Sequence, residues 1–241
     1  MMDTEVHLWN FPHIRMTILV VAAHPDDEVL GCGGTIARLA LEKHQVHILI
    51  LGEGATSRYA HAADAPAQEK TALRKQAEAA GRLLGARSVT VQGLPDNRFD
   101  SLDLLDIVKV IEAKITELSP EVIYTQHGGD LNIDHALTFR AVLTATRPLA
   151  GSCMKRIYAY AVPSSTEWSF QKFEPAFSPN TFVDIATTLE KKIEAMALYE
   201  GENRAFPHPR SAQALRAHAQ YWGSVAGLQA AEPSELIRAV R

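Results

Sequence analysis

Two clusters of histidine and acidic residues could do chemistry. The first lies in the stretch VVAAHPDDE, where an apolar run ends abruptly in His24, Asp26, Asp27 and Glu28. The second is the stretch QHGGDLNIDH, which ends at His135. Imidazole and carboxylate groups bind divalent metals, and a site of two histidines and one aspartate leaves coordination positions open for water or substrate. The two clusters together therefore indicate a metal site.

A divalent metal at such a site lowers the pKa of a bound water to about 7 and polarises a carbonyl oxygen. One of the adjacent acids Asp26 and Asp27 can bind the metal while its neighbour takes the proton of the water. The alternative is a simple turn, whose aspartates bond backbone amides and cap the next helix. The presence of a second cluster of histidine and acidic residues favours the metal site over a simple turn. In addition, several acids at the end of a buried segment are unfavourable unless a cation compensates their charge.

The segments around these clusters alternate between two periodicities. Apolar, β-branched runs predict buried strands at residues 17–23, 46–51, 88–91 and 122–125. Helical spacing predicts helices at residues 34–44, 67–84, 102–118 and 134–145. This alternation predicts an α/β fold with a mostly parallel sheet flanked by helices.

In doubly wound sheets, ligands bind outside the carboxyl ends of the strands. Both clusters directly follow predicted strands, so we expect them to meet at that rim. Later in the chain, residues 156–162 and 181–185 are expected to form peripheral strands, and residues 188–199 and 212–227 to form helices. We expect these elements to complete a single domain, residues 1–241, and to wall its site.

Composition excludes several classes of protein. The 241 residues carry a net charge of −4, and lysine and arginine form no stripe, which disfavours nucleic acid and anionic membranes as partners. The only cysteines, Cys32 and Cys153, are too few for a disulfide framework, so a reducing compartment fits. The apolar run at residues 16–23 is too short to span a bilayer and lacks the flanks of a signal peptide. We expect a soluble cytoplasmic protein.

Two rival chemistries are disfavoured. The glycines at residues 31, 33 and 34 follow the first strand, but Ile36 occupies the place of the third glycine of a dinucleotide fingerprint. These glycines fit close packing of a helix on the sheet better. The chain has no G-x-S-x-G motif, and Cys32 fits a small buried residue better than a nucleophile.

The stretches AAHPDDEVLGCGGTIARLA and GDLNIDHALTFRAVLTATRP resemble the PIG-L/LmbE-like family of metal-dependent N-deacetylases. The resemblance runs from about residue 17 to 148. It implies a Rossmann-like fold, a bound Zn2+ or another divalent metal such as Fe2+, and removal of an acetyl group from the amine of an amino sugar. The implied partner is a small N-acetylated sugar or glycoconjugate, and the chain is expected to act alone or as a homo-oligomer.

Carried over to this sequence, the resemblance makes His24, Asp27 and His135 the metal ligands. Asp26 becomes the general base and later the acid that protonates the leaving amine, while Glu28 supports the loop. Asn132 stands where many members carry a histidine that stabilises the oxyanion. An amide can donate a hydrogen bond there but cannot shuttle protons.

Other roles stay open at this point. His127 is an alternative oxyanion donor, or a solvated loop residue. Asp134 either orients a histidine or caps a helix. Arg58 and Asp96, on loops after the second and third strands, are expected to bind substrate, with a surface ion pair as the alternative.

The alternatives to an amino-sugar deacetylase are an amidase acting on a larger acyl group or a thiol–sugar conjugate, and a sugar-binding homologue without activity. A non-haem iron oxygenase also uses two histidines and a carboxylate. The adjacent Asp26 favours hydrolysis over oxygen chemistry.

Overall fold

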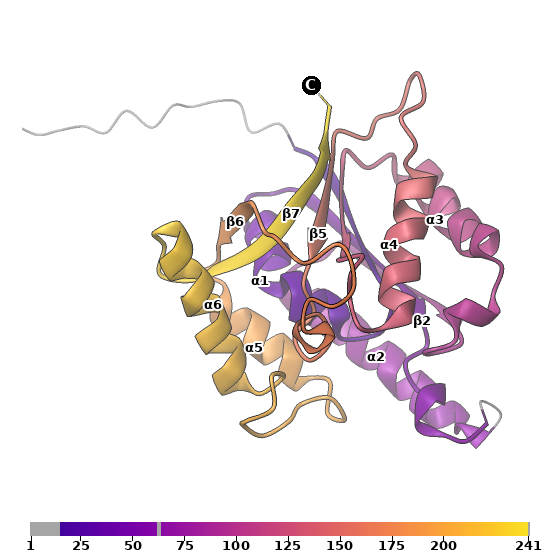
Figure 1. The fold of residues 1–241 in the computed structure, drawn as a ribbon, viewed down its shortest axis with the longest axis horizontal. Helices are drawn as coiled ribbons and strands as arrows, with labels where there is room; N and C mark the ends of the chain where they lie inside the picture. Colours follow the sequence, from indigo (N-terminus) through magenta and orange to yellow (C-terminus); the bar gives the residue numbers. More distant parts are fainter. Residues whose placement is uncertain (1–14, 62–63, 241) are drawn as a thin grey trace, which may run out of the picture.

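The computed structural model describes residues 15–61 and 64–240. Its centre is a seven-stranded sheet with the order β3-β2-β1-β4-β5-β7-β6 (Figure 1). The first five strands pair in parallel, and β7 pairs antiparallel with both β5 and β6. The strands are β1 (Thr17–Ala22), β2 (Gln45–Gly52), β3 (Ser88–Leu94), β4 (Val122–Gln126), β5 (Arg156–Tyr160), β6 (Thr181–Asp184) and β7 (Ala231–Ala239).

Helices cover both faces of this sheet (Figure 1). They are α1 (Asp27–Leu41), α2 (Ala67–Leu84), α3 (Leu104–Leu118), α4 (Ile133–Ala145), α5 (Leu189–Ala197) and α6 (Ala212–Ala226). The helices α3 and α4 pack on one face against Leu19, Val21 and Ile123, while α1, α2 and α5 pack on the other against Val20 and Ile48. The predicted α/β fold with a mostly parallel sheet is confirmed. Among the described helices, none combines the length and apolar character needed to cross a membrane.

The strands β1 and β4 lie side by side at the centre of the sheet. From β1 the chain continues outward to β2 and β3, whereas from β4 it continues to β5 on the other side. The order of strands therefore reverses between β1 and β4. In doubly wound sheets, such a reversal opens a crevice beyond the carboxyl ends of the two strands, and ligands bind there. The loops that carry both clusters lie at this position.

Helix α1 starts earlier than its sequence pattern predicts. It begins at Asp27, so the acids of the first cluster form its first turn, where negative charge is favourable. Its backbone is kinked at Cys32, with φ −143°. Gly31 meets the buried ring of Tyr160, and a Cβ on Gly31 would lie 2.0 Å from that ring. The close packing expected of these glycines is confirmed.

A buried ion pair fills the kink. Lys192 of α5 donates to the carbonyl oxygen of Leu30 at 2.8 Å and to Glu232 Oε1 at 2.6 Å. Glu232 of β7 in turn accepts hydrogen bonds from the backbone N–H groups of Gly34 and Thr35. The pair thus satisfies backbone groups that the interrupted helix leaves without partners. It also ties the late elements to the helix that carries the first cluster.

The late part of the chain differs most from expectation. Residues 156–160 form β5, which lies inside the sheet between β4 and β7, so its prediction as a peripheral strand is wrong. The strand β7 has no counterpart in the sequence analysis. Its Pro233 and its glutamates argue against a strand, and its place between β5 and β6 depends on tertiary pairing.

Candidate metal and substrate site

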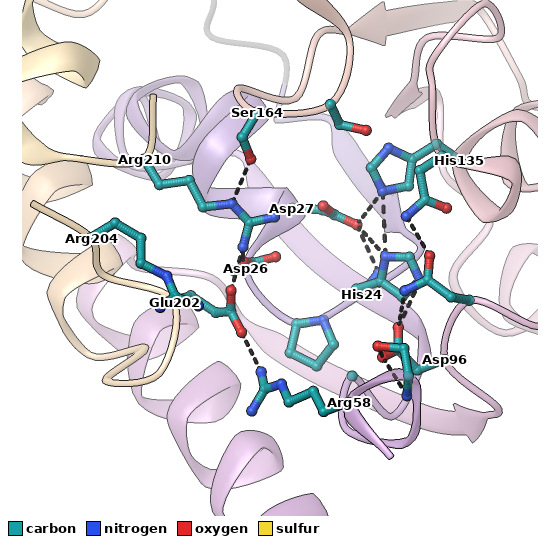
Figure 2. A pocket seen from close by; sticks show the side chains of 16 residues that line it. His24, Asp26, Asp27, Arg58, Asp96, His135, Ser164, Glu202, Arg204 and Arg210 are labelled. Atoms are coloured by element: carbon teal, nitrogen blue, oxygen red, sulfur yellow. Dashed lines mark hydrogen bonds and ion pairs between the residues drawn. The ribbon is translucent and has the colours of Figure 1, made fainter. Parts of the chain in front are cut away.

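The loops that follow β1 and β4 bring the two clusters together (Figure 2). His24 Nδ1, Asp27 Oδ2 and His135 Nε2 converge on one point. The two histidine nitrogens are 3.3 Å apart, and Asp27 Oδ2 lies 3.3 Å from His24 Nδ1 and 3.2 Å from His135 Nε2. All three residues are buried. In a tetrahedral zinc site with bonds of about 2.0–2.1 Å, neighbouring ligand atoms lie roughly 3.3 Å apart. These residues could therefore hold a divalent metal.

Acids outside this triad lie close to both histidine rings and orient the ring of His24. His24 Nε2 lies 2.9 Å from Asp134 Oδ2 and 3.2 Å from Asp96 Oδ1. Donation from Nε2 leaves the lone pair of Nδ1 directed at the site, as is usual for histidines that bind metals. His135 Nδ1 lies 3.1 Å from Asp130 Oδ1 but out of line for a good hydrogen bond. His24, Asp96 and Asp134 form a second group that could hold a cation, but both acids already accept protein hydrogen bonds.

The electrostatic field at the triad favours positive charge. Burial would lower the pKa of His135, but Asp27 and Asp130 raise it to about 9. For Asp27, burial would raise the pKa, but His135 and His24 hold it well below its usual value. A field that favours a proton on an imidazole also favours a divalent cation between the same groups. The donor set and the field therefore fit a bound metal.

Asp26 occupies a strained position beside the triad. Its φ is 112°, which is unfavourable for a residue with a side chain. Glu28 accepts a hydrogen bond from the Asp26 backbone N–H at 3.1 Å and another from the Tyr199 hydroxyl, as expected for a residue that supports the loop. The Asp26 carboxylate accepts a hydrogen bond of 2.6 Å from Arg210 Nη1. Burial raises the pKa of Asp26 well above its usual value, although Arg210 opposes this shift.

The pocket beside the triad has a volume of about 240 Å³. Arg58 and Asp96 both line it, so the structure brings both predicted substrate-binding residues to the site. Arg58 also pairs with Glu69 and Glu202. Asp96 holds Ser57 through its carboxylate. Arg58 therefore shows both features that were expected as alternatives: it lines the pocket and it forms ion pairs.

Asn132 lines the pocket, but both ends of its amide are engaged. Its Oδ1 accepts a hydrogen bond from Asp134 N at 2.9 Å and caps α4, while Nδ2 donates to Asn97 Oδ1 at 2.8 Å. Because Asn132 caps α4, the Asp134 side chain does not serve as the cap and contacts His24 instead.

His127 is neither solvated nor directed at the pocket. Its side chain is 1 % exposed, and its two ring nitrogens bond Glu235 Oε2 at 2.9 Å and the carbonyl oxygen of Pro175 at 2.7 Å. His127 therefore supports the sheet and the loop around Pro175.

Several pocket residues come from the late part of the chain, and the sequence pattern singled out none of these particular residues. Ser164 and Ser165 follow β5, and Glu202, Arg204 and Arg210 precede α6. The sequence signal for them is weak, because serine and arginine in an irregular segment occur on most protein surfaces. Only the expectation that this segment walls the site pointed toward them.

With this geometry in place, comparison with known proteins identifies the family. Residues 19–146 match the model of the family PIG-L, described as GlcNAc-PI de-N-acetylase. The matched range contains both clusters, most of β1 and all of β2, β3 and β4. The chain belongs to the PIG-L family. The expectation of a hydrolytic N-deacetylase is confirmed at the level of this family.

Individual relatives of this PIG-L chain have different substrates. A 1D-myo-inositol 2-acetamido-2-deoxy-alpha-D-glucopyranoside deacetylase from Mycobacteroides abscessus is 28% identical over 84% of this chain and 80% of its own length. A 4-oxalmesaconate hydratase from Pseudomonas putida is also 28% identical, over 80% of this chain and 77% of its own. The structure of N,N'-diacetylchitobiose deacetylase from Pyrococcus horikoshii has the same fold. It superposes with a TM-score of 0.72 at 19% identity, covering 97% of this chain and 88% of that one.

Proposed function

We propose that this protein is a metal-dependent deacetylase that releases acetate from the amine of an N-acetylated amino sugar or amino-sugar conjugate. The observation that carries the proposal is the convergence of His24 Nδ1, Asp27 Oδ2 and His135 Nε2 beside the strained carboxylate of Asp26. Support for the substrate class comes from relatives that are deacetylases of acetamido sugars.

We assign His24, Asp27 and His135 as the metal ligands and Zn2+ as the metal, because the spacing of the donor atoms fits tetrahedral coordination. When bound, a divalent metal supplies Lewis acidity, which acidifies water and polarises the acetyl carbonyl. Asp134 keeps His24 in the tautomer that can ligate.

Asp26 acts as the proton carrier in this proposal. Its carboxylate takes a proton from water as the water oxygen bonds to the carbonyl carbon, and the carbonyl electron pair moves onto oxygen. When the tetrahedral intermediate collapses, the carbonyl re-forms and the carbon–nitrogen bond breaks. Asp26 returns its proton to the departing nitrogen. One water is consumed, and the products are the free amine and acetic acid, which loses its remaining proton to solvent and leaves as acetate.

The polar pocket would hold the sugar. Arg58 and Asp96 lie on its wall, and we assign them to the sugar hydroxyls and ring substituents. Hydrogen-bonding groups line most of the remaining wall, which suits a hydroxyl-rich ligand.

An acetate-release assay tests this function. Zinc-loaded protein is mixed with N-acetylhexosamines, their nucleotide-linked forms and N-acetylated glycoconjugates, with Asp26→Asn as the control. Acetate release from one group, lost in the variant, supports the proposal and selects the substrate class.

A second candidate reaction is hydration of an unsaturated carboxylate, which the hydratase relative favours. The same protein is therefore also mixed with an unsaturated dicarboxylate, and loss of its ultraviolet absorbance is followed. Absorbance loss without acetate release from any sugar would replace the deacetylase proposal with the hydratase reaction.

A further inference from the structure

Amide hydrolysis needs a hydrogen-bond donor for the oxygen that becomes negative when the carbonyl is attacked. Most side-chain donors around the pocket are already engaged with neighbouring acceptors. Ser57 donates to Asp96, Asn97 donates to Asp96, Asn132 donates to Asn97, and Ser165 donates to Asp130. A donor to the oxyanion must therefore come from another residue of the pocket.

Arg210 lines the pocket beside Asp26, and one of its guanidinium nitrogens is available as a hydrogen-bond donor. Its Nε donates to Ser164 Oγ at 2.8 Å, and its Nη1 donates to Asp26 Oδ2 at 2.6 Å and also to Glu202. Its Nη2 donates no hydrogen bond within residues 15–61 and 64–240. Figure 2 shows the guanidinium between Ser164 and Asp26, on the side of the pocket where Asp27 lies. The group is thus held on two edges and keeps one terminal nitrogen free.

The position of Asp26 limits where the oxyanion can form. The attacking water must lie within hydrogen-bond reach of the Asp26 carboxylate, and the attacked carbon is one bond from the water oxygen. The oxyanion is attached to that same carbon. Since the planar guanidinium already contacts Asp26 through Nη1, its rigid fork places Nη2 next to the reacting group.

Arg210 keeps its charge in this environment. Burial would lower its pKa, but the carboxylates around it, led by Asp26 and Glu202, raise the pKa above the usual value. Its side chain is only 20 % exposed, so water screens its field weakly. By contrast, Arg204 on the same pocket wall is exposed to solvent.

We propose that Arg210 is the oxyanion-stabilising residue of this site, donating from Nη2 to the acetyl oxygen as that oxygen gains charge. The inference rests on the proposed deacetylase function and names a residue outside the matched family range, residues 19–146. It assigns Asn132 to the α4 cap instead. Arg210 exchanges no proton in the step: it holds the oxyanion through a hydrogen bond while Asp26 carries the proton.

The competing interpretation is that Arg210 only positions Asp26 and makes no contact with the oxyanion. Binding measurements distinguish these two roles. The probe is a methylphosphonamidate of the amino sugar that the wild type deacetylates, because its tetrahedral anionic phosphorus mimics the intermediate. Its affinity is measured by calorimetry for zinc-loaded Asp26→Asn and for Asp26→Asn/Arg210→Gln. Both proteins lack the Asp26 carboxylate. A lower affinity of the double variant than of Asp26→Asn therefore cannot result from a displaced general base.

We expect the double variant to bind the probe on the order of 10²-fold more weakly, the usual effect of one oxyanion donor. The product amine, which has no such oxygen, should bind both variants about equally. Arg216→Gln is the matched control, because it removes an arginine that bonds Glu190 through two nitrogens outside the pocket. Zinc content and melting temperature are checked for every variant.

Equal affinity of the two variants for the probe would overturn the role of Arg210 and leave the deacetylase function intact. So would weaker binding of probe and product amine alike, because the lost contact would then not be with the oxyanion. A wild type that releases no acetate from any sugar would overturn the function itself, and the role of Arg210 with it.

Discussion

His24 Nε2 lies 2.9 Å from Asp134 Oδ2, although the two residues are 110 positions apart in the chain. This contact joins the loop after β1 to the first turn of α4. Asp134 also accepts a hydrogen bond from the Phe99 backbone N–H, so the carboxylate is fixed from two sides. It determines which nitrogen of His24 carries the proton, and therefore which one can bind a metal.

Replacing Asp134 by Asn should weaken metal binding about 10–100-fold. The amide can still accept from Phe99, but its NH2 group would face His24 Nε2 and favour the tautomer with a proton on Nδ1. Zinc affinity is measured by competition with a chromophoric chelator. Asp106→Asn, at an exposed position of α3, is the control and should bind zinc like the wild type. Unchanged zinc affinity in Asp134→Asn would contradict the orienting role.

Replacing Asp26 by Asn should leave the metal bound and lower kcat by about 10²–10⁴-fold, the usual contribution of a general base. The amide keeps the shape of the side chain and its contact with Arg210, but it cannot take a proton. Acetate release and elemental analysis are measured on the same preparation. Activity within a few-fold of the wild type would remove Asp26 from the mechanism.

Much of the fold and the core of the candidate site could be predicted from the sequence. Helix α2 was predicted with its observed bounds, because the alanine-rich pattern ends at Gly85, which has a φ of 86° and forms the C-cap. The clusters around His24 and His135 could be placed together because each follows a buried parallel strand. In these segments local pattern and tertiary structure agree.

The rest depends on contacts that a pattern does not contain. Glu232 looks like a surface residue, yet it is 4 % exposed because Lys192 and two backbone N–H groups compensate its charge. Because a glutamate at this position does not indicate a buried strand, the sequence pattern does not predict β7. Arg210 likewise looks like a solvated loop arginine until Asp26 is placed beside it.

The pair between Lys192 and Glu232 gives a prediction on stability. Replacing Lys192 by Met should lower the free energy of unfolding by about 3 kcal/mol, because it leaves a buried carboxylate without its cation and the Leu30 carbonyl without its donor. Urea unfolding measures the change. Lys109→Met, which breaks an exposed pair with Glu112, should cost less than about 1 kcal/mol. Similar losses in the two variants would show that the buried pair has no special role.

Glu28 should make stability depend on pH. Burial raises its pKa to about 7, against an ordinary value of 4.5. Below pH 4.5 both the folded and unfolded states hold the proton. Between pH 4.5 and 7 only the folded state does, so stability falls as the pH rises, by up to about 3 kcal/mol.

Glu28→Gln removes this titration. Its stability relative to the wild type should therefore improve between pH 5 and pH 8. Urea unfolding of the zinc-loaded proteins at several pH values measures the difference. Parallel curves for the two proteins would show that Glu28 does not titrate in this range.

Variants of Asn132 test separately whether this residue caps α4 or stabilises the oxyanion. Its Oδ1 caps α4, and loss of such a cap costs about 1 kcal/mol. Asn132→Ala should therefore lower the free energy of unfolding by about that amount. Asn132→Ser should retain most of the stability, because serine caps equally well. If the cap is the main role of Asn132, kcat should fall less than tenfold in both variants. A loss of 10²-fold or more in Asn132→Ser, with stability retained, would instead return the oxyanion role to Asn132.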